Sequence, residues 1–147
     1  MLHIIKTITD SLINFLKEDP VRPSIPQEAR IGENKDVFVL REDEQVKSIL
    51  CVSYQNNIPT KEAELFELCE KPTAAIFYTV WSYSPGAGRT LIFDTVDHIE
   101  QNMPHIQRFV TLSPKTEMAR KFHLKNGAVI FRENDESVNY EYIRLHK

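Results

Sequence analysis

Cysteine and glycine are both scarce in this sequence of 147 residues. The two cysteines, Cys51 and Cys69, lie far apart and form no CxxC motif. Both occur in apolar-rich segments, so we expect buried free thiols in a reducing cytoplasm rather than a disulfide framework or a cysteine zinc site. Glycine occurs only four times, and no repeat or low-complexity segment is present.

Long apolar runs and an excess of basic charge are also missing. Asp10 and Lys17 interrupt the N-terminal apolar stretch, which argues against a signal peptide, a membrane-spanning helix and a membrane partner. Lys and Arg number 18 against 21 Asp and Glu, so the net charge is −3. Basic residues are scattered, which argues against a nucleic-acid partner. Hydrophobic residues make up 41% of the chain, an ordinary value for a soluble globular protein.

The apolar pattern predicts one mixed α/β (α+β) domain over residues 1–147, long enough to bury its own core. Helical spacing of apolar residues predicts an amphipathic helix at residues 3–18. Pro20, Pro23 and Pro26 then forbid a continuous helix, so residues 1–27 form this helix and a proline-rich loop. Apolar runs predict strands at 36–41, 46–54, 74–81, 108–112, 129–132 and 138–143, and helical spacing predicts helices at 61–70, 89–102 and 116–126.

A glycine-containing turn at residues 82–89, Ser-Tyr-Ser-Pro-Gly-Ala-Gly-Arg, joins a predicted buried strand to a predicted helix. Glycine lets the backbone approach a ligand closely, and the free N–H groups at the start of a helix favour phosphate. An ordinary strand-to-helix turn is the alternative. The turn resembles the Gln/Arg-x-x-Gly-x-Gly/Ala motif by which GNAT acetyltransferases hold the coenzyme A pyrophosphate, with Tyr83 where Gln or Arg is usual. This resemblance implies CoA contacts from Tyr83, Gly86, Ala87, Gly88, Arg89 and Thr90.

Ser113 and His123 are the candidate catalytic residues, although each has a purely structural alternative. Ser113 precedes Pro114 and suits a helix N-cap, and a single His on a helix is usually packed or at the surface. On one straight helix their separation would correspond to about 15 Å of rise, so we expect Ser113 in a turn ahead of the helix. His98 and His105 have no partner at metal-ligand spacing, and we expect no metal.

Several blocks of the sequence resemble malonyl-CoA decarboxylases, whose catalytic domain has the GNAT (acyl-CoA N-acyltransferase) fold. The blocks are residues 73–78, 88–96, 104–106, 111–114 (Thr-Leu-Ser-Pro), 122–131 (beginning Phe-His-Leu-Lys-Asn-Gly-Ala) and 138–142 (Val-Asn-Tyr-x-Tyr). The resemblance covers about residues 28–143. In that family a long helical insertion separates the serine and histidine blocks, whereas this chain joins them directly.

The resemblance implies an acyl-CoA-binding enzyme that decarboxylates malonyl-CoA or a close analogue. The matching family residues are catalytic, which places the roles on Ser113 and His123. Decarboxylation builds an enolate, so backbone N–H groups of the strand that carries Phe77, Thr79 and Trp81 would hold the thioester oxygen. His123 would supply or relay the proton, a role that suits the near-neutral pKa of histidine.

Two other functions stay open at the level of the sequence. One is an acetyl-CoA-dependent N-acetyltransferase, in which His123 acts as general acid or base toward an amine. The other is a non-catalytic acyl-CoA-binding module. A homodimer is an arrangement that the sequence leaves open.

Overall fold

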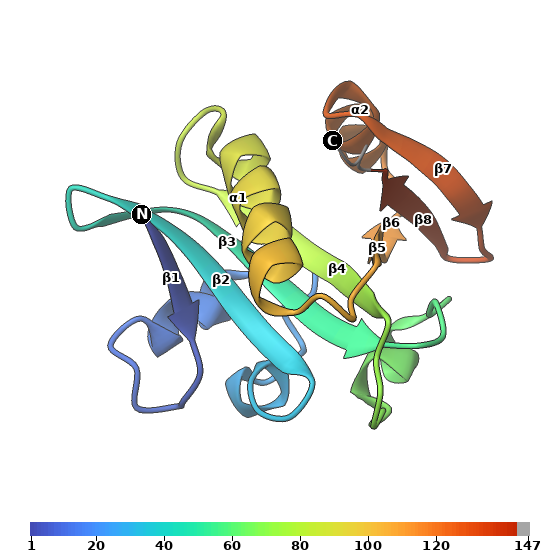
Figure 1. Cartoon of the computed structure of the whole chain (residues 1–147). Coiled ribbons are helices and arrows are strands. Elements are labelled where there is room, and N and C mark those ends of the chain that lie inside the picture. The colour runs from blue at the N-terminus through green and yellow to red at the C-terminus, as the bar shows by residue number, and fades with distance from the viewer. Residues whose placement is uncertain (144–147) are drawn as a thin grey trace.

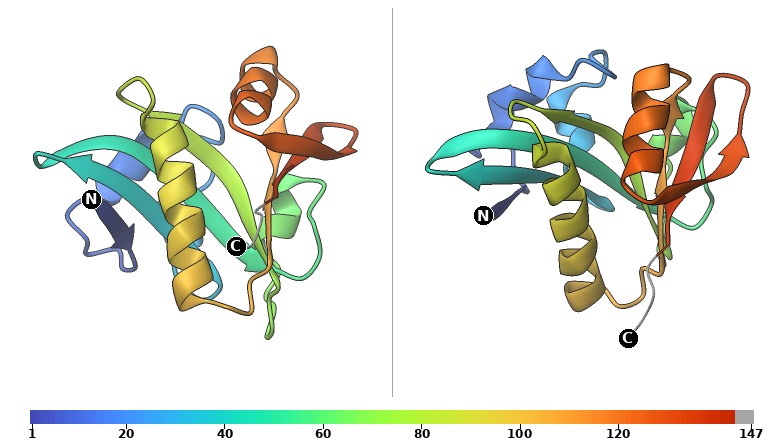
Figure 2. Two further views of the ribbon diagram at one scale, coloured as in Figure 1. Left: turned by 45° about the horizontal axis from the view of Figure 1, so that its top comes forward. Right: turned by 90° about the horizontal axis from the view of Figure 1, so that it is seen from above.

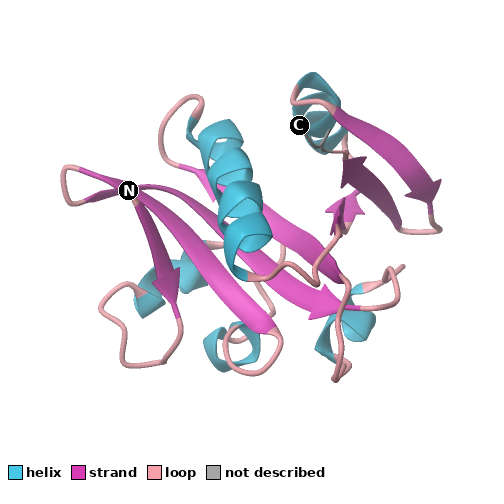
Figure 3. Cartoon of the chain, in the orientation of Figure 1, coloured by secondary structure: helices cyan, strands magenta, loops and turns pink. Residues whose placement is uncertain are grey.

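The computed structural model of this chain describes residues 1–143. Its central element is an eight-stranded sheet with helices on both faces (Figures 1 and 3). The strand order is β1-β2-β3-β4-β5-β8-β6, and β7 pairs with β8. The strands are β1 (Leu2–Ile5), β2 (Lys35–Glu42), β3 (Gln45–Gln55), β4 (Ala74–Ser82), β5 (Arg108–Thr111), β6 (Ser113–Pro114), β7 (Ala128–Glu133) and β8 (Ser137–Tyr142). The helices are α1 (Ala87–Asn102) and α2 (Glu117–Lys125), with three short 3-10 helices, η1 (Ile13–Glu18), η2 (Gln27–Arg30) and η3 (Glu62–Phe66).

The first half of the sheet is antiparallel, and β4 pairs in parallel only with β5. A two-residue turn joins β2 to β3, and both turn residues, Asp43 and Glu44, have positive φ (53° and 65°). Such primed turns match the right-handed twist of the strands that they connect. The predicted strands at 36–41, 46–54 and 74–81 are therefore confirmed as β2, β3 and β4, with small shifts at their ends.

Apolar side chains form one core on each face of the sheet. Figure 2 shows α1 on one face and the N-terminal segment on the other. Helix α1 packs Leu91, Ile92, Val96 and Ile99 against one face, which confirms the predicted helix at 89–102. The N-terminal segment with η1 and η2 packs against the other face, where Leu16 and Ile25 are buried. Helices that cover both faces explain why β4 reads as an almost uninterrupted apolar run.

The predicted N-terminal helix at residues 3–18 is wrong. Residues 2–5 form β1 against the edge of β2, and only Ile13–Glu18 forms a 3-10 helix. The Asp10 carboxylate accepts a hydrogen bond from the Leu12 N–H (2.8 Å), a local turn that competes with a helix. Ile8, counted as part of the apolar helix face, is 61% exposed. The predicted helix at 61–70 is likewise reduced to the short η3.

The C-terminal third follows the prediction more closely. Helix α2 starts at Thr116, whose hydroxyl accepts a hydrogen bond from the Ala119 N–H (3.2 Å), and ends before Gly127, which has a φ of 98°. The predicted strands at 108–112, 129–132 and 138–143 correspond to β5, β7 and β8. The short β6 was not predicted. None of the helices described in residues 1–143 has the length and apolarity that crossing a membrane requires.

A buried ion pair fixes the N-terminal segment to the back of β4. Arg30 Nη1 donates to Asp19 Oδ2 (2.7 Å), and neither side chain is exposed. Asp19 Oδ1 also accepts bonds from the backbone N–H of Val21 (2.7 Å) and from the hydroxyl of Thr79 (3.0 Å). Multiple partners of this kind offset the cost of removing two charges from water.

Replacing Arg30 with Met should therefore lower the free energy of unfolding by about 3 kcal/mol or more, because Asp19 would keep a buried charge without its cation. Urea unfolding of the two proteins measures the difference. The matched control is Lys6→Met, which removes the pair between exposed Lys6 and Asp36 and should cost no more than about 1 kcal/mol. Equal losses in both variants would contradict a special role for the buried pair.

Candidate active site

The candidate site lies where the parallel strands β4 and β5 separate. Their ladder runs from Ala74↔Arg108 to Phe77↔Thr111, and the Leu112 N–H then donates to the Phe77 carbonyl (3.0 Å). Beyond this point the chain leaves β4 to form β6, which pairs with β8 instead. Strand β4 continues to Ser82 paired with β3 only, so its backbone on the β5 side borders an opening in the sheet.

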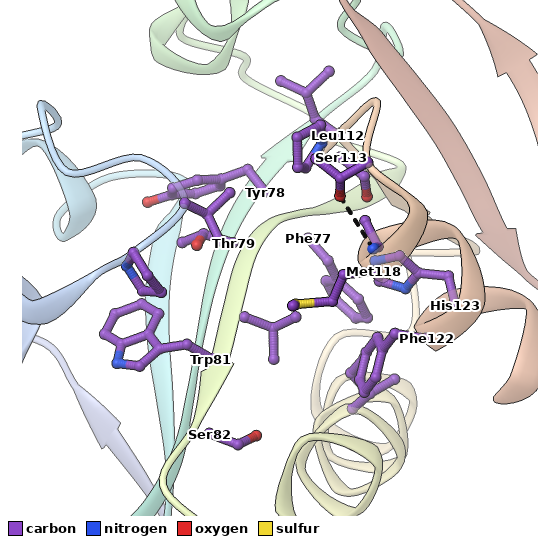
Figure 4. Close-up of a pocket in the computed structure, with 17 residues that line it drawn as sticks. Phe77, Tyr78, Thr79, Trp81, Ser82, Leu112, Ser113, Met118, Phe122 and His123 are labelled. Atoms are coloured by element: carbon purple, nitrogen blue, oxygen red, sulfur yellow. Dashed lines mark hydrogen bonds between the residues drawn. The ribbon is translucent and has the colours of Figure 1, made fainter.

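A cavity of about 370 Å³ fills this opening (Figure 4). Its walls come from β4, from the segment between β5 and α2, from α2 itself and from the N-terminal loop. The lining residues are Pro20, Val21, Phe77, Tyr78, Thr79, Val80, Trp81, Ser82, Ile92, Leu112, Ser113, Pro114, Thr116, Met118, Ala119, Phe122 and His123. This lining is mostly apolar, and within the described part of the chain it includes no Lys, Arg, Asp or Glu. A largely apolar cavity with a few convergent polar groups is typical of a small-molecule site.

A bulge in β4 sets which side chains face the cavity. Cys51 of β3 lies opposite Thr79 and Val52 lies opposite Phe77, so Tyr78 is an extra residue on β4. The alternation of side chains shifts there: Phe77 and Val80 join the core on the α1 face, whereas Tyr78 and Trp81 join the core on the opposite face. Bulges commonly redirect side chains next to functional sites.

His123 is the buried histidine of α2, with 5% of its surface exposed. Its Nδ1 lies 2.7 Å from the hydroxyl of Tyr142, and its ring stacks on Tyr140 with 5.0 Å between centroids. Burial lowers the pKa of His123 to about 4, because the charged imidazolium loses its hydration. The expected near-neutral pKa is therefore wrong for the ligand-free protein. The ring is neutral at physiological pH, and Nε2 is the nitrogen that Tyr142 leaves to the cavity.

Ser113 belongs to β6 and does not cap helix α2, since Thr116 provides the N-cap. The structural alternative of Ser113 as a cap is therefore wrong. The hydroxyl of Ser113 donates to Thr111 Oγ1 (2.8 Å), which also accepts a bond from the Tyr140 N–H (3.0 Å). A serine held in this way presents oxygen lone pairs to the cavity rather than its proton.

The structure brings Ser113 and His123 to the same cavity, with Ser113 in the short strand β6 rather than in the expected turn ahead of the helix (Figure 4). The Ser113 hydroxyl is bonded to Thr111 and the His123 Nδ1 to Tyr142. The pair is therefore not arranged as a nucleophile and its general base, in which the two side chains share a hydrogen bond. Both groups instead face whatever occupies the cavity.

Three of the predicted CoA-contacting residues also line the cavity: Phe77, Thr79 and Trp81. The Thr79 hydroxyl is directed to Asp19, and the Trp81 Nε1 donates to the hydroxyl of Tyr83 (3.0 Å). A ligand can therefore contact the backbone of these three residues and the ring surfaces of Phe77 and Trp81.

Ser82 is the residue of the glycine turn that lines the cavity, and residues 83–89 lie beside it. A Cβ on Gly88 would lie 2.9 Å from the Ser82 Oγ and 3.2 Å from the Phe122 ring, and both neighbours line the cavity. Gly88 thus allows close packing of α1 against β4 and α2, and its predicted contact with CoA stays a prediction. Gly86 has a φ of 80° and begins α1 without a side-chain cap. The Ala87 N–H donates to the Ser84 carbonyl (3.2 Å) and the Thr90 N–H to the Gly86 carbonyl (3.2 Å), which leaves the N–H groups of Gly88 and Arg89 for a ligand.

The side chains of the turn have partners within the protein. The Tyr83 hydroxyl donates to Glu18 of η1, and its ring packs edge-on against Phe15. Arg89 Nη1 donates to Asn126 Oδ1 (2.9 Å) at the end of α2, and its guanidinium lies 4.9 Å from the centre of the Phe93 ring. Any phosphate contact at this turn therefore falls mainly to the backbone N–H groups of Gly88 and Arg89, since the Ala87 and Thr90 N–H groups already donate to carbonyls of the turn.

Sequence reasoning missed several residues of the site. Tyr142 orients His123 and Thr111 orients Ser113, and Pro20 and Val21 of the N-terminal loop contribute wall surface. The Val-Asn-Tyr-x-Tyr block contained a usable signal, because alternate residues of a strand share one face and would direct both tyrosines to the same side. Nothing in the sequence marked the N-terminal loop as part of this wall.

Comparisons with known proteins match this geometry at the level of the fold. No protein-family model matches the sequence, and a search of curated proteins finds no match. Malonyl-CoA decarboxylase from Cupriavidus metallidurans superposes with a TM-score of 0.75 at 14% identity, over 97% of this chain and 60% of that one. The enzyme of the same name from Agrobacterium vitis gives 0.69 at 21% identity, over 83% of this chain and 35% of that one. A PaiA N-acetyltransferase from Thermoplasma acidophilum, in complex with coenzyme A, gives 0.61 at 10% identity, over 96% and 98% of the two chains.

These similarities confirm the predicted GNAT fold and the predicted structural resemblance to malonyl-CoA decarboxylases. This chain spans only 35% to 60% of the length of the two decarboxylase chains, and 98% of the length of the acetyltransferase. At such identities the likeness establishes the shape of the chain alone, so its activity must be argued from the site.

The lowered pKa of His123 predicts how stability depends on pH. Between the ordinary histidine pKa of about 6.5 and the folded value of about 4, the unfolded chain binds a proton that the folded chain does not. The free energy of unfolding should therefore fall as pH is lowered through this window. His123→Gln should flatten that slope, and exposed His105→Gln should leave it unchanged, as measured by urea unfolding from pH 4 to 7.5. Identical slopes in wild type and His123→Gln would show that the burial of His123 is not linked to its protonation.

Proposed function

We propose that this chain is an acyl-CoA-binding enzyme and that it decarboxylates malonyl-CoA or a related carboxyacyl-CoA. One observation carries the proposal: an apolar cavity opens where β4 and β5 separate, with Ser113 and His123 in its wall and the N-terminus of α1 beside it. The proposal includes that this chain has the activity without further domains, since it spans only 35% to 60% of the two decarboxylase chains that share its fold.

The binding path follows from the positions of the glycine turn and the cavity. The uncapped N–H groups of Gly88 and Arg89 and the helix dipole favour a pyrophosphate at the start of α1. The pantetheine arm would then pass Ser82 and Phe122, which lie between the turn and the cavity. Inside, its amides would meet the β4 backbone, which no longer pairs with β5 after Phe77.

The chemistry needs one bond broken and one proton delivered. The bond between the α-carbon and the carboxylate breaks, carbon dioxide leaves, and the electron pair remains as the enolate of the thioester. Backbone N–H groups of β4 would stabilise the enolate oxygen, and a proton added to the α-carbon gives the acetyl thioester. The apolar lining favours this step, because a carboxylate without a cationic partner is poorly stabilised there and carbon dioxide carries no charge.

His123 would bind the carboxylate through Nε2 and assist the proton transfer. Its ring is neutral in the ligand-free protein, but an anionic carboxylate close to the ring would raise its pKa again. Binding of the carboxylate would thus draw a proton from solvent onto His123, which can then deliver it to the α-carbon. Ser113 would orient the carboxylate from the neighbouring wall, after its hydroxyl turns away from Thr111.

Turnover of malonyl-CoA should fall by about 10²-fold or more in His123→Asn, which retains hydrogen bonding but cannot carry a proton. Ser113→Ala should also lower turnover. Because Ser113 is not a helix cap, its variant should unfold near the wild-type temperature, whereas loss of a cap costs about 1 kcal/mol. Mass spectrometry of the acyl-CoA products measures the rate, and thermal melting measures stability. Equal turnover by wild type and folded His123→Asn would remove His123 from the mechanism.

An added negative charge near the start of α1 tests the phosphate site better than a larger residue at Gly88, because a side chain at Gly88 would also disturb packing. Thr90 lies exposed in the first turn of α1. Thr90→Glu should weaken CoA binding by about ten-fold, because a carboxylate there repels the pyrophosphate. Thr90→Gln has nearly the same shape without the charge and should bind almost as wild type does. Calorimetric titration with CoA compares them, and equal affinities of the two variants would place the pyrophosphate elsewhere.

The assay also separates the other functions that the sequence leaves open. An N-acetyltransferase, the activity named for one protein of the same fold, consumes acetyl-CoA only when an amine acceptor is present. A binding module binds CoA thioesters without consuming them. Carbon dioxide release from malonyl-CoA alone distinguishes the proposed decarboxylase from both.

A further inference from the structure

Arg22 occupies the gap between the separating strands on the side away from α1. Its Nε donates to the Tyr78 carbonyl of β4 (2.9 Å), and its Nη2 donates to the Leu112 carbonyl just after β5 (2.8 Å). One guanidinium thus bridges the two strands at the point where their own ladder ends. Its third nitrogen, Nη1, donates to Glu62 of η3 (3.1 Å), and the side chain is only 13% exposed.

The segment that carries Arg22 is fixed in place by hydrogen bonds to the buried Asp19–Arg30 ion pair. The Arg22 N–H donates to Asp19 Oδ1 (3.0 Å), and the Arg22 carbonyl accepts a bond from Arg30 Nη2 (2.8 Å). The two residues between Asp19 and Arg22 line the cavity. Each end of the segment is therefore anchored to the Asp19–Arg30 pair, and its middle forms cavity wall.

The bridged carbonyls lie at the deep end of the cavity. Tyr78, Leu112 and Ser113 are all buried there, whereas Ser82 is exposed (Figure 4). Figure 4 shows Ser82 at the opposite end of the cavity from Leu112 and Ser113. A molecule that enters past Ser82 would bring its far end to Ser113 and His123, with the Arg22 bridge behind that end.

We infer that Arg22 seals the gap between β4 and β5 behind this cavity and so makes the acyl-CoA the sole substrate of the site. The inference rests on the proposed binding of CoA past Ser82. An amine acceptor would have to reach the thioester from the deep end, because CoA fills the other end. That route requires removal of Arg22, which would leave two buried carbonyls without a donor. The site therefore suits a reaction within the acyl group, such as decarboxylation, and excludes acyl transfer to an amine.

The first test uses Trp81, the single tryptophan of the chain, which lines the cavity. Acrylamide quenching of its fluorescence should increase by about two-fold or more in Arg22→Ala, because removing the bridge admits solvent. Arg41→Ala, which changes an arginine of β2, a strand that pairs with β1 and β3 and not with β4, should leave quenching unchanged. This measurement needs no CoA, so it tests the closure even if the proposed function fails. Equal quenching in wild type and folded Arg22→Ala would overturn the inference.

The second test asks whether Arg22→Ala gains the ability to transfer the acyl group to an amine. With acetyl-CoA and a small primary amine, the amine nitrogen would bond to the thioester carbonyl, the C–S bond would break, and the thiolate would take the amine's proton. Wild type should release CoA no faster with the amine than without it. Arg22→Ala should release CoA with the amine at least about ten-fold faster than it does without the amine. Added methylguanidinium should refill the gap and suppress the release.

Amine-dependent release by wild type at the rate of the variant would overturn the inference, as would its absence from a folded Arg22→Ala protein that binds CoA. Failure of wild type to bind CoA would instead contradict the proposed function and leave the quenching result to decide the closure. Arg22→Gln, which keeps one donor for the carbonyls, replaces Arg22→Ala if that variant does not fold, and it should give intermediate quenching and release.

Discussion

The separation of β4 from β5 is the constraint on which the rest of this structure depends. A parallel ladder that stops after four residue pairs leaves peptide groups of a central strand without partners, and unpaired groups in a core are costly. The protein meets this cost differently on the two sides of the gap. Arg22 supplies donors to two carbonyls at the deep end, and the remaining β4 backbone borders a cavity that a ligand can fill.

The charged side chains near β4 lie on one side of the strand, and the cavity on the other side is lined by uncharged residues. Behind the strand, Arg30 pairs with Asp19 and Arg22 pairs with Glu62, and backbone bonds of Arg22 to Asp19 and Arg30 fix the segment between η1 and η2. In front of it, the cavity wall is uncharged, and burial keeps His123 neutral. A substrate carboxylate would therefore be the dominant charge in the cavity, and its environment would favour the loss of that charge.

The elements that were predicted correctly are those whose apolar residues pack locally onto the sheet. Leu91, Ile92, Val96 and Ile99 recur at helical spacing and face one layer of the core, and β4 is apolar because it is covered on both faces. The N-terminal helix was predicted wrongly because its apolar residues have a different use. Residues 2–5 pair with the free edge of β2, and Leu12 and Leu16 reach the core from a turn and a 3-10 helix. Edge pairing is a long-range choice that local periodicity does not encode.

By itself, the sequence determined the mixed α/β fold, the glycine turn before α1, and the two candidate residues Ser113 and His123 that line one cavity. Local patterns and family-like blocks carry that information within short stretches of chain. Only the tertiary structure decided the pKa of His123, its pairing with Tyr142, the direction of the Ser113 hydroxyl and the position of Arg22 between two strands. These properties depend on burial and on partners between 2 and 90 positions away, and no local pattern specifies them.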